Sequence, residues 1–507
     1  MDDTLLDYYE RELTFFRAMG AEFARKYPKV AGRLLLEPDK CDDPHKERLI
    51  EAFALISGRI HKKIDDGLPE ITESFLNILY PHYVNPIPSM AIVQFDPARK
   101  TITPTGYRID RNTVLYSKPI GGTPCQFMTS YPVTLWPVEV VEAELRDPKR
   151  LMKNVQQAIA IRLKTFNQQS FSQLNWDRFR IFLNGPAQHV FHLYELLSNH
   201  VTHIECESTN RDGETVVLPL SPKVIQPVGF EPEEAMIPAT GRTFPGYVLL
   251  FEYFCFPEKF LFLDLTGLAA LKGLDCNDTL TLWIYLDRLA KPNLVVNAHT
   301  FCAHATPAIN LFKRIAEPIR VEHRKPEYHV IPDVRRREAT EVFNIDRVTA
   351  IGAEGTGKTF EFKPFYSIRH QDGEEDGPEA RRAFWHPERR PSGMKGDDGT
   401  EVFISFTDLH FDRTDPEVET LTVHVTCTNR DLPARLPFGD PLGDFDMEMA
   451  APITKITSLI KPTPTRRPAL GGALQWHLVS HLALNHLSLV RGDRKSTRLN
   501  SSHVSES

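Results

Sequence analysis

Residues 280–286 read LTLWIYL, and this stretch decides the fold class. Its aliphatic side chains fall on every second position. Successive side chains of a strand point to opposite faces of a sheet, so a period of two predicts a half-buried strand. The same period occurs in residues 159–163, 402–406 and 421–427. From residue 89 onward we therefore expect mainly strands, interrupted by one helix that begins at Pro186.

The first 80 residues follow a different period, which is that of helices. Apolar or small residues recur at alternating spacings of four and three from Tyr9 to Tyr27, and a second apolar face follows Pro44. This spacing places them on one stripe of a helix. A third segment, residues 69–80, is apolar on several sides and ends before Pro81. A helix that is apolar on more than one side needs packing partners on each of them.

The helical stripe is the candidate partner interface. Two interpretations of it stay open: the helices pack only on each other, or they join a bundle with another chain. Gly20 on the stripe would let another helix approach closely. The residues assigned to this candidate interface are Tyr9, Leu13, Phe16, Gly20, Phe23, Tyr27, Phe53 and Phe75.

Length and composition indicate a multidomain cytoplasmic protein. A prior of roughly 100–200 residues per domain gives three or four domains for 507 residues. The net charge of −7 is spread over both signs and provides no basic footprint for nucleic acid. An uninterrupted apolar run of about 18 residues is missing, as is a secretory signal pattern. The seven cysteines are scattered, which favours buried, reduced thiols.

One nucleotide-binding motif is formally complete. The pattern G-x-x-x-x-G-K-[ST], which cradles phosphates, is satisfied by Gly352, Gly357, Lys358 and Thr359. Such a loop needs a following helix, whose free N–H groups and dipole face the phosphates. Here residues 360–364 alternate and then reach a proline, which predicts the second strand of a hairpin. The hairpin is the preferred interpretation, and a P-loop nucleotide-binding protein that uses residues 352–359 is kept as the alternative function.

Other chemistry has little support in the sequence. His299, Cys302 and His304 lie close together, but their spacing matches no common zinc pattern, so packing is the preferred interpretation. The sequence has no G-x-S-x-G elbow and no H-E-x-x-H. We therefore expect no catalytic residues, no metal, no cofactor and no enzymatic activity. A carbohydrate-binding or tail-fibre-like β protein is a weaker third interpretation.

A series of segments in chain order resembles the TssF family of the bacterial type VI secretion system. The segments are residues 5–27 (LLDYYERELTFFRAMGAEFARKY), 44–66, 79–95 (LYPHYVNPIPSMAIVQF), 244–268 (FPGYVLLFEYFCFPEKFLFLDLTGL), 306–312 (TPAINLF) with 317–319, 328–333, 427–439 (CTNRDLPARLPFG) and 476–489 (WHLVSHLALNHLSL). A series that spans residues 5 to about 490 is far more specific than any single short motif.

The resemblance implies a structural role in the baseplate. A TssF-like chain would form wedges with TssG, bind TssK and TssE, and surround the VgrG spike beneath the contractile sheath proteins. It also implies a second TssF copy in each wedge and a cytoplasmic location, docked at the inner-membrane secretion complex through TssK. The implied fold is a multidomain α+β protein with mainly antiparallel β domains, as in contractile-phage baseplate wedge proteins.

The expected domain organisation follows from these patterns. We expect a helical region at 1–88, a β-rich domain with one inserted helix at 89–305, and a second β-rich domain at 306–460 with an exposed loop at 371–400. A linker and the start of a C-terminal helical region would occupy 461–492. The polar, Ser-rich residues 493–507 resemble translated adapter sequence, so we expect a C-terminally truncated chain whose last residues pack poorly.

Overall fold

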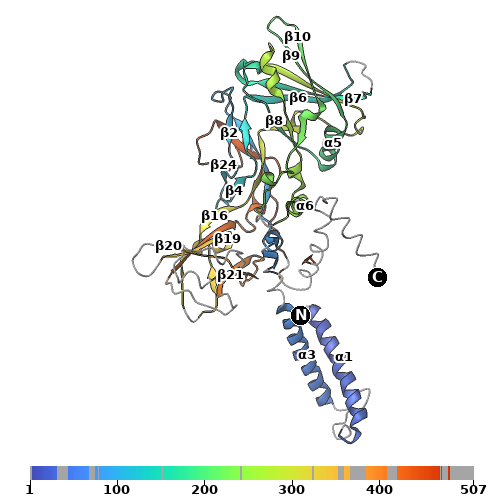
Figure 1. Cartoon of the computed structure of the whole chain (residues 1–507), viewed down its shortest axis with the longest axis vertical. Coiled ribbons are helices and arrows are strands. Elements are labelled where there is room, and N and C mark those ends of the chain that lie inside the picture. Colours follow the sequence, from blue (N-terminus) through green and yellow to red (C-terminus); the bar gives the residue numbers. More distant parts are fainter. Residues whose placement is uncertain are drawn as a thin grey trace, which may run out of the picture. The chain divides into compact units, whose positions relative to one another are not determined.

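The computed structural model describes most of the chain (Figure 1). The described residues are 3–30, 44–67, 73, 75–77, 79–149, 154–239, 243–322, 325–351, 359–365, 384–407, 420–468, 470 and 478–479. The chain divides into two compact units: a helical unit, made of residues 1–79 and 469–507, and a β unit, Tyr80–Pro468. The tail from residue 493 onward lies outside the described residues.

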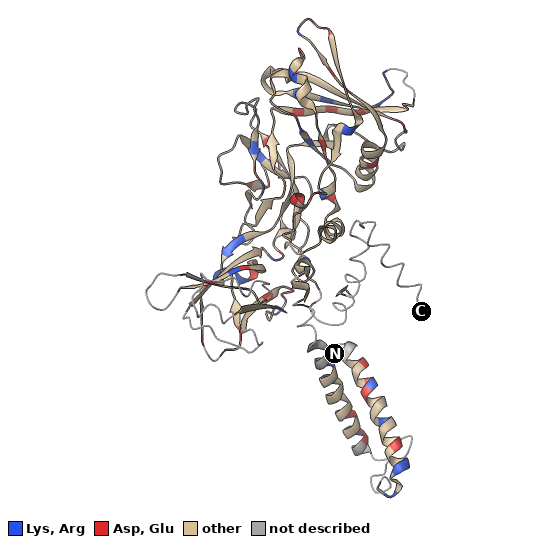
Figure 2. Ribbon diagram, viewed as in Figure 1, with Lys and Arg blue, Asp and Glu red and all other residues tan. Residues whose placement is uncertain are grey.

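The helical unit contains two antiparallel helices, which confirm the first two predicted helical segments. They are α1 (Asp3–Lys26) and α3 (Pro44–Gly67). α1 carries charged residues of both signs along its length (Figure 2). Most of the third predicted segment, residues 69–80, lies outside the described residues.

The β unit is built around a closed six-stranded barrel. Its strands, in order around the barrel, are β1 (Met90–Pro97), β15 (Ala305–Ile309), β4 (Gln126–Thr129), β3 (Val114–Ser117), β24 (Phe445–Asp446) and β25 (Ile453–Ser458). Alternate side chains of these strands fill the interior, where the rings of Phe127 and Phe445 meet edge to face at 5.2 Å. A small ribbon, β2 (Tyr107–Ile109) with β5 (Val133–Leu135), adds residues to the same core.

The second part of the β unit contains two sheets that share the largest core. One sheet has the order β10 (Thr215–Leu220), β9 (Val201–Thr209), β13 (Thr279–Leu286), β7 (Gln157–Thr165) and β6 (Val138–Arg146). The other has the order β11 (Ile225–Pro227), β12 (Phe262–Leu265), β8 (Phe179–Leu183) and β14 (Phe301–Ala303). Two helices accompany them, α5 (Ala187–Asn199) and α6 (Pro245–Cys255).

The third part of the β unit pairs two further sheets around a separate core. One has the order β16 (Phe312–Ile315), β23 (Thr420–Thr428), β19 (Glu341–Ile351) and β20 (Thr359–Phe362), with β17 (Ile319–Arg320) also on β23. The other has the order β18 (Tyr328–Val330), β22 (Thr400–Thr407) and β21 (Phe384–Pro391). The buried side chains of β22 alternate along the strand, as its sequence predicts.

Three expectations need correction. Residues 384–391, which we expected in an exposed loop, form β21, because Trp385 is buried and its Nε1 donates to Phe362 O at 2.9 Å. The β region holds a second helix, α6, besides the one that follows Pro186. Finally, β13 is buried on both faces and not half-buried, because Trp283 and Tyr285 pack in a small cluster on the face opposite the main core.

The predicted domain boundaries stay a prediction. The barrel combines strands that precede residue 305 with strands that follow it, since β1 pairs with both β15 and β25. After β25 the chain continues beside residues 87–92, and Arg466 N donates to Ile87 O at 3.1 Å. This final segment, residues 459–467, is called the strap below.

Candidate assembly surfaces

The two helices of the helical unit meet at a close backbone contact. A Cβ added at Gly58 would lie 3.1 Å from the carbonyl carbon of Tyr8 and from the nitrogen of Tyr9. Only glycine permits this approach without a shift of the helices. Gly20, by contrast, has no neighbouring atom within 4 Å of an added Cβ. Its expected role toward another helix therefore stays a prediction.

A buried polar cluster fixes the register of the two helices. Glu12 on α1 is only 6% exposed. Its carboxylate accepts a hydrogen bond from Ser57 Oγ and is hydrogen-bonded to His61 Nδ1, each at 2.7 Å. The hydrogen bond from Ser57 is the largest cause that lowers the pKa of Glu12, and burial opposes it. A buried polar group that finds its partners in one register disfavours the others.

We expect Ser57→Ala to destabilise the helical pair by about 1 kcal/mol at pH 7, the usual cost of one lost hydrogen bond. A carboxyl whose folded pKa is depressed stabilises the fold above its unfolded pKa, and this contribution is lost as pH falls through the folded pKa. The difference from wild type should therefore shrink as the pH falls below 4.5, the ordinary pKa of Glu12. Hydrogen exchange of peptides from residues 44–67 would measure it.

The matched control for this experiment is Thr14→Ala. Thr14 Oγ1 donates only to the backbone oxygen of Glu10, at 2.8 Å. Its effect should be small and independent of pH. A Ser57→Ala effect that is equally large at pH 7 and below pH 4.5 would contradict the assignment of Glu12.

Each helix leaves an apolar stripe uncovered. On α3, side chains spaced by four, three and four residues are more than half exposed: Leu49 58%, Phe53 61%, Ile56 56% and Ile60 53%. On α1 the exposed side chains include Phe15, Met19 and Phe23. This spacing is the seam that coiled-coil helices bury against a partner. The pair therefore buries only part of its apolar surface.

The predicted interface residues divide into two groups. Tyr9, Leu13, Phe16 and Gly20 are half-buried, whereas Phe23, Tyr27, Phe53 and Phe75 are exposed, at 38%, 49%, 61% and 46%. The sequence predicted an apolar face on α3, but only Phe53 of that face was assigned to the candidate interface. Leu49, Ile56 and Ile60, which share the face, are exposed as well.

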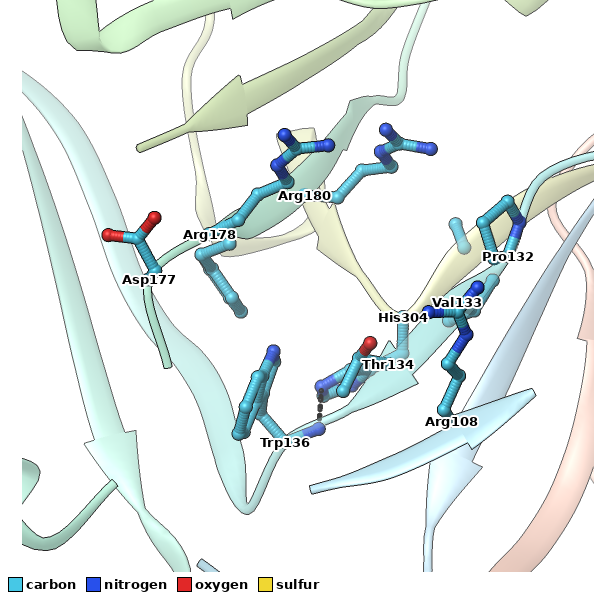
Figure 3. Close-up of a pocket in the computed structure, with 11 residues that line it drawn as sticks. Arg108, Pro132, Val133, Thr134, Trp136, Asp177, Arg178, Arg180 and His304 are labelled. Carbon is cyan, nitrogen blue, oxygen red and sulfur yellow. Dashed lines mark hydrogen bonds between the residues drawn. The ribbon is translucent and has the colours of Figure 1, made fainter. Parts of the chain in front are cut away.

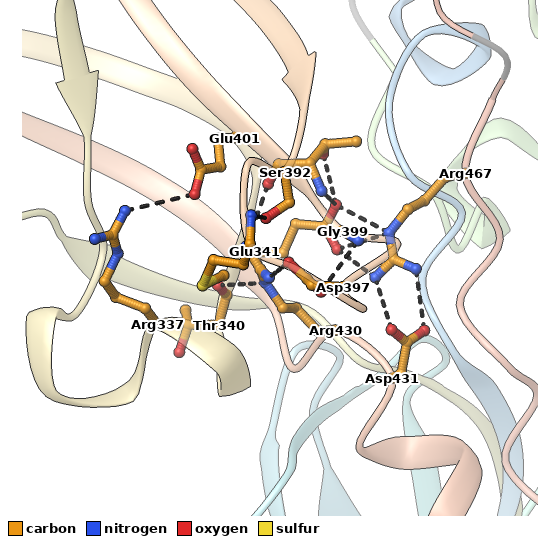
Figure 4. Close-up of polar contacts among 12 residues, drawn as sticks. Arg337, Thr340, Glu341, Ser392, Asp397, Gly399, Glu401, Arg430, Asp431 and Arg467 are labelled. Atoms are coloured by element: carbon orange, nitrogen blue, oxygen red, sulfur yellow. Dashed lines mark hydrogen bonds and ion pairs between the residues drawn. The ribbon is translucent and has the colours of Figure 1, made fainter. Parts of the chain in front are cut away.

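A second set of contacts ties the barrel to the third part of the β unit (Figure 4). Arg467, in the strap, donates from Nη2 to Glu341 Oε2 at 2.8 Å and from Nη1 to Asp431 Oδ1 at 3.1 Å. The Glu341 side chain on β19 is completely buried. Arg430 pairs with Asp397 in the same network and donates to Thr340 O at 3.1 Å. These contacts hold the strap, β19 and β22 in one arrangement.

A third feature is a cavity of about 320 Å³ lined by Arg108, Arg178, Arg180 and His304 (Figure 3). Arg180 forms a two-point pair with Asp264, at 2.8 and 2.9 Å, and Arg178 reaches the same carboxylate. His304 Nε2 accepts the Trp136 N–H at 3.1 Å, and burial lowers the pKa of His304 to about 4. The histidine is therefore neutral at physiological pH and serves structure.

The residues considered for a metal site have structural contacts. Cys302 Sγ donates to His299 O at 3.3 Å, and burial raises the pKa of the Cys302 thiol to about 12. His304 supports the backbone at Trp136. Within the described ranges no group of three or more His, Cys, Asp or Glu side chains has a geometry suited to a metal ion.

The phosphate-loop match lies between two antiparallel strands. β19 ends at Ile351, β20 begins at Thr359, and these two residues pair directly. Residues 352–358 themselves lie outside the described residues. Phosphate binding needs a helix that begins at Thr359, but a strand begins there. The antiparallel pairing of β19 with β20 confirms the predicted hairpin.

Comparisons with known proteins agree over nearly the whole chain. The family model for the type VI secretion system protein TssF matches residues 1–501. The type VI secretion system component TssF1 of Pseudomonas aeruginosa is 33% identical, with 96% of this chain and 81% of the relative covered. Among the described residues, no helix has the length and apolar character needed to cross a membrane.

Two solved baseplate structures have similar folds. A chain of a TssK–TssF–TssG baseplate subcomplex superimposes with a TM-score of 0.68 and 26% identity, over 87% of this chain and 79% of that chain. A chain of the type VI secretion baseplate complex gives a TM-score of 0.54 and 25% identity, over 94% and 80%. Together with the family model and the relative of 33% identity, they show that the chain belongs to the TssF family of the type VI secretion system.

Proposed function

We propose that the chain is a structural wedge subunit of the type VI secretion baseplate and that it assembles with TssG and TssK. The observation that carries this proposal is the superposition on a chain of the TssK–TssF–TssG subcomplex over 87% of this chain. The role is mechanical: the wedge holds its partners in place and changes arrangement when the sheath contracts. Contacts with TssE, the VgrG spike, the sheath and a second TssF copy belong to this proposal, as does a cytoplasmic position at the inner-membrane complex.

The helical pair is the proposed site of assembly with TssG. Burying a large apolar side chain contributes roughly 1.5–3 kcal/mol, and the exposed stripe of α3 offers four such side chains. Helices with a heptad-like seam associate with other helices by interlocking side chains. The polar cluster at Glu12 keeps the pair in one register, so the seam is presented before the partner binds.

Co-purification with TssG and TssK of the same secretion system tests the proposal. We expect the double variant Phe53→Ser with Ile60→Ser to reduce recovery of TssG at least tenfold, because it removes two side chains from the seam. Both side chains are more than half exposed, so the helices should still form, which circular dichroism would check. The control is Leu289→Ser, an apolar residue of the β unit that is 61% exposed. Equal recovery of TssG with both variants would refute the interface.

A further inference from the structure

Helix α6 is apolar on two opposite sides. Tyr247 and Val248 face the β unit and are each 5% exposed. On the outer side, Leu250, Tyr253 and Phe254 are 44%, 51% and 78% exposed. A helix that is apolar all round is normally covered on every side. The outer stripe of α6 is therefore a surface that the described residues leave uncovered.

The outer stripe continues into a larger aromatic surface. The ring of Tyr253 lies 5.5 Å from that of Phe254 and 5.9 Å from that of Phe260. Phe260, which is itself buried, connects Tyr253 to Phe230: its ring lies 5.0 Å from that of Phe230, which is 47% exposed. Contiguous exposed apolar side chains mark interaction sites, whereas single ones are ordinary. We name this surface the α6 patch; its exposed members are Phe230, Leu250, Tyr253 and Phe254.

A buried ion pair holds the α6 patch rigid. Glu252, on the inner side of α6, pairs with Lys259, and both side chains are 1% exposed. The Oε1 atom of Glu252 also accepts the N–H groups of Met236 and Ile237, at 2.7 and 2.8 Å. α6 is thereby fixed near its C-terminal end to the chain before and after it. A surface that is already ordered loses little entropy when a partner binds.

The rim of the α6 patch carries more acidic than basic side chains, Arg111 being the basic one, which donates to Glu233 O and Ala235 O. Glu231 and Glu233 follow Phe230 and are exposed, and Glu258 precedes Lys259 and Phe260. Lys259 is buried in its pair with Glu252, and residues 245–255 contain no Lys or Arg. Charge complementarity across an interface selects partners of the opposite sign. The rim therefore favours a partner with basic residues beside its apolar contacts.

We propose that the α6 patch docks an amphipathic helix of a baseplate partner. Residues at positions i, i+3 and i+4 of α6 form a ridge, and such a ridge packs into the groove of another helix. The apolar stripe of the partner helix lies on Leu250, Tyr253 and Phe254, and its flanking Lys or Arg side chains face Glu231 and Glu233. This inference rests on the proposed function, because the partner is sought in the TssG–TssK subcomplex.

The test measures the affinity for purified TssG–TssK subcomplex of the same secretion system. We expect Leu250→Ser with Phe254→Ser to raise the Kd at least tenfold, since exposed aromatic anchors dominate binding energy. The matched control, Leu442→Ser, removes an apolar side chain that is 87% exposed elsewhere on the β unit and should leave the Kd unchanged. Raising the salt concentration should weaken binding of wild type and have less effect on Glu231→Lys with Glu233→Lys.

Every other outcome overturns the proposal. If the double variant binds like Leu442→Ser while wild type binds well, the α6 patch is not a docking site and the proposed function stands. If wild type does not bind the subcomplex, both the docking proposal and the proposed function are refuted. A lower Tm of the isolated double variant would mean that the chain covers its own patch. A change in self-association by light scattering would mean that a second copy covers it.

Discussion

Lys259→Met lowers the free energy of unfolding of the β unit by about 3–5 kcal/mol, the expected cost of breaking a buried ion pair from one side. The ammonium group of Lys259 contacts the Glu252 carboxylate and donates to Glu234 O at 3.2 Å. Both side chains of the pair are 1% exposed. The variant leaves the Glu252 carboxylate buried without its ion-pair partner.

The control for Lys259→Met is the double variant Glu252→Gln with Lys259→Met. Glutamine retains a side-chain oxygen that can accept the N–H groups of Met236 and Ile237, which Glu252 accepts now. It carries no charge, so the desolvation cost disappears together with the pair. Urea unfolding, followed by tryptophan fluorescence, should show the double variant to be more stable than Lys259→Met. The reverse order would mean that the charge of the pair is not what matters at this site.

Periodicity predicted the elements whose two faces differ. β22 and β23 and the helices α1 and α3 follow from the spacing of their apolar residues, because one face of each is more deeply buried than the other. α6 escaped prediction because it is apolar on both sides, which leaves no period to detect.

Two further features depend on contacts between distant parts of the chain. β21 contains the charged residues Glu388, Arg389 and Arg390, which suggested a loop. It is a strand because it pairs with β22 along its whole length, and Arg389 donates to the carbonyl oxygens of Val342 and Phe343, both at 2.8 Å. The barrel closes through β1 and β15, and Ile92 pairs with Pro307. The spacing of residues within one segment cannot predict contacts between residues so far apart in the sequence.

The candidate surfaces were predictable in part. The helical stripe followed from spacing alone, although the sequence could not show which of its residues are covered by the second helix. The polar network at Glu341 joins residues that are 126 positions apart, so nothing in the sequence links them. Most of the α6 patch lies in residues 244–268, one of the segments that resemble the TssF family. The sequence could not show which apolar side of α6 is buried and which is exposed.

Arg467→Ala should be the second strongly destabilising substitution, at about 3–5 kcal/mol, because the Glu341 carboxylate is completely buried and loses its only described cation. Glu341 would keep the Thr400 N–H and hydroxyl, at 2.8 and 2.6 Å, which do not neutralise its charge. Arg467→Lys should recover part of the loss, since one ammonium group cannot bind Glu341 and Asp431 as the planar guanidinium does.

An exposed ion pair provides the contrast for Arg467. Arg99 pairs with Glu139 at 2.5 Å, but its side chain is 64% exposed, so Arg99→Ala should cost less than about 1 kcal/mol. Hydrogen exchange localises the effect: Arg467→Ala should speed exchange in the strap and in β19, which the arginine joins, and leave β7 and β13 unchanged. If exchange rises uniformly over the β unit, the network contributes to global stability and does not hold this junction. If Arg467→Ala and Arg99→Ala cost the same, burial of Glu341 is not decisive, and the arrangement of the strap against β19 must depend on the strap's backbone hydrogen bonds to residues 87–92.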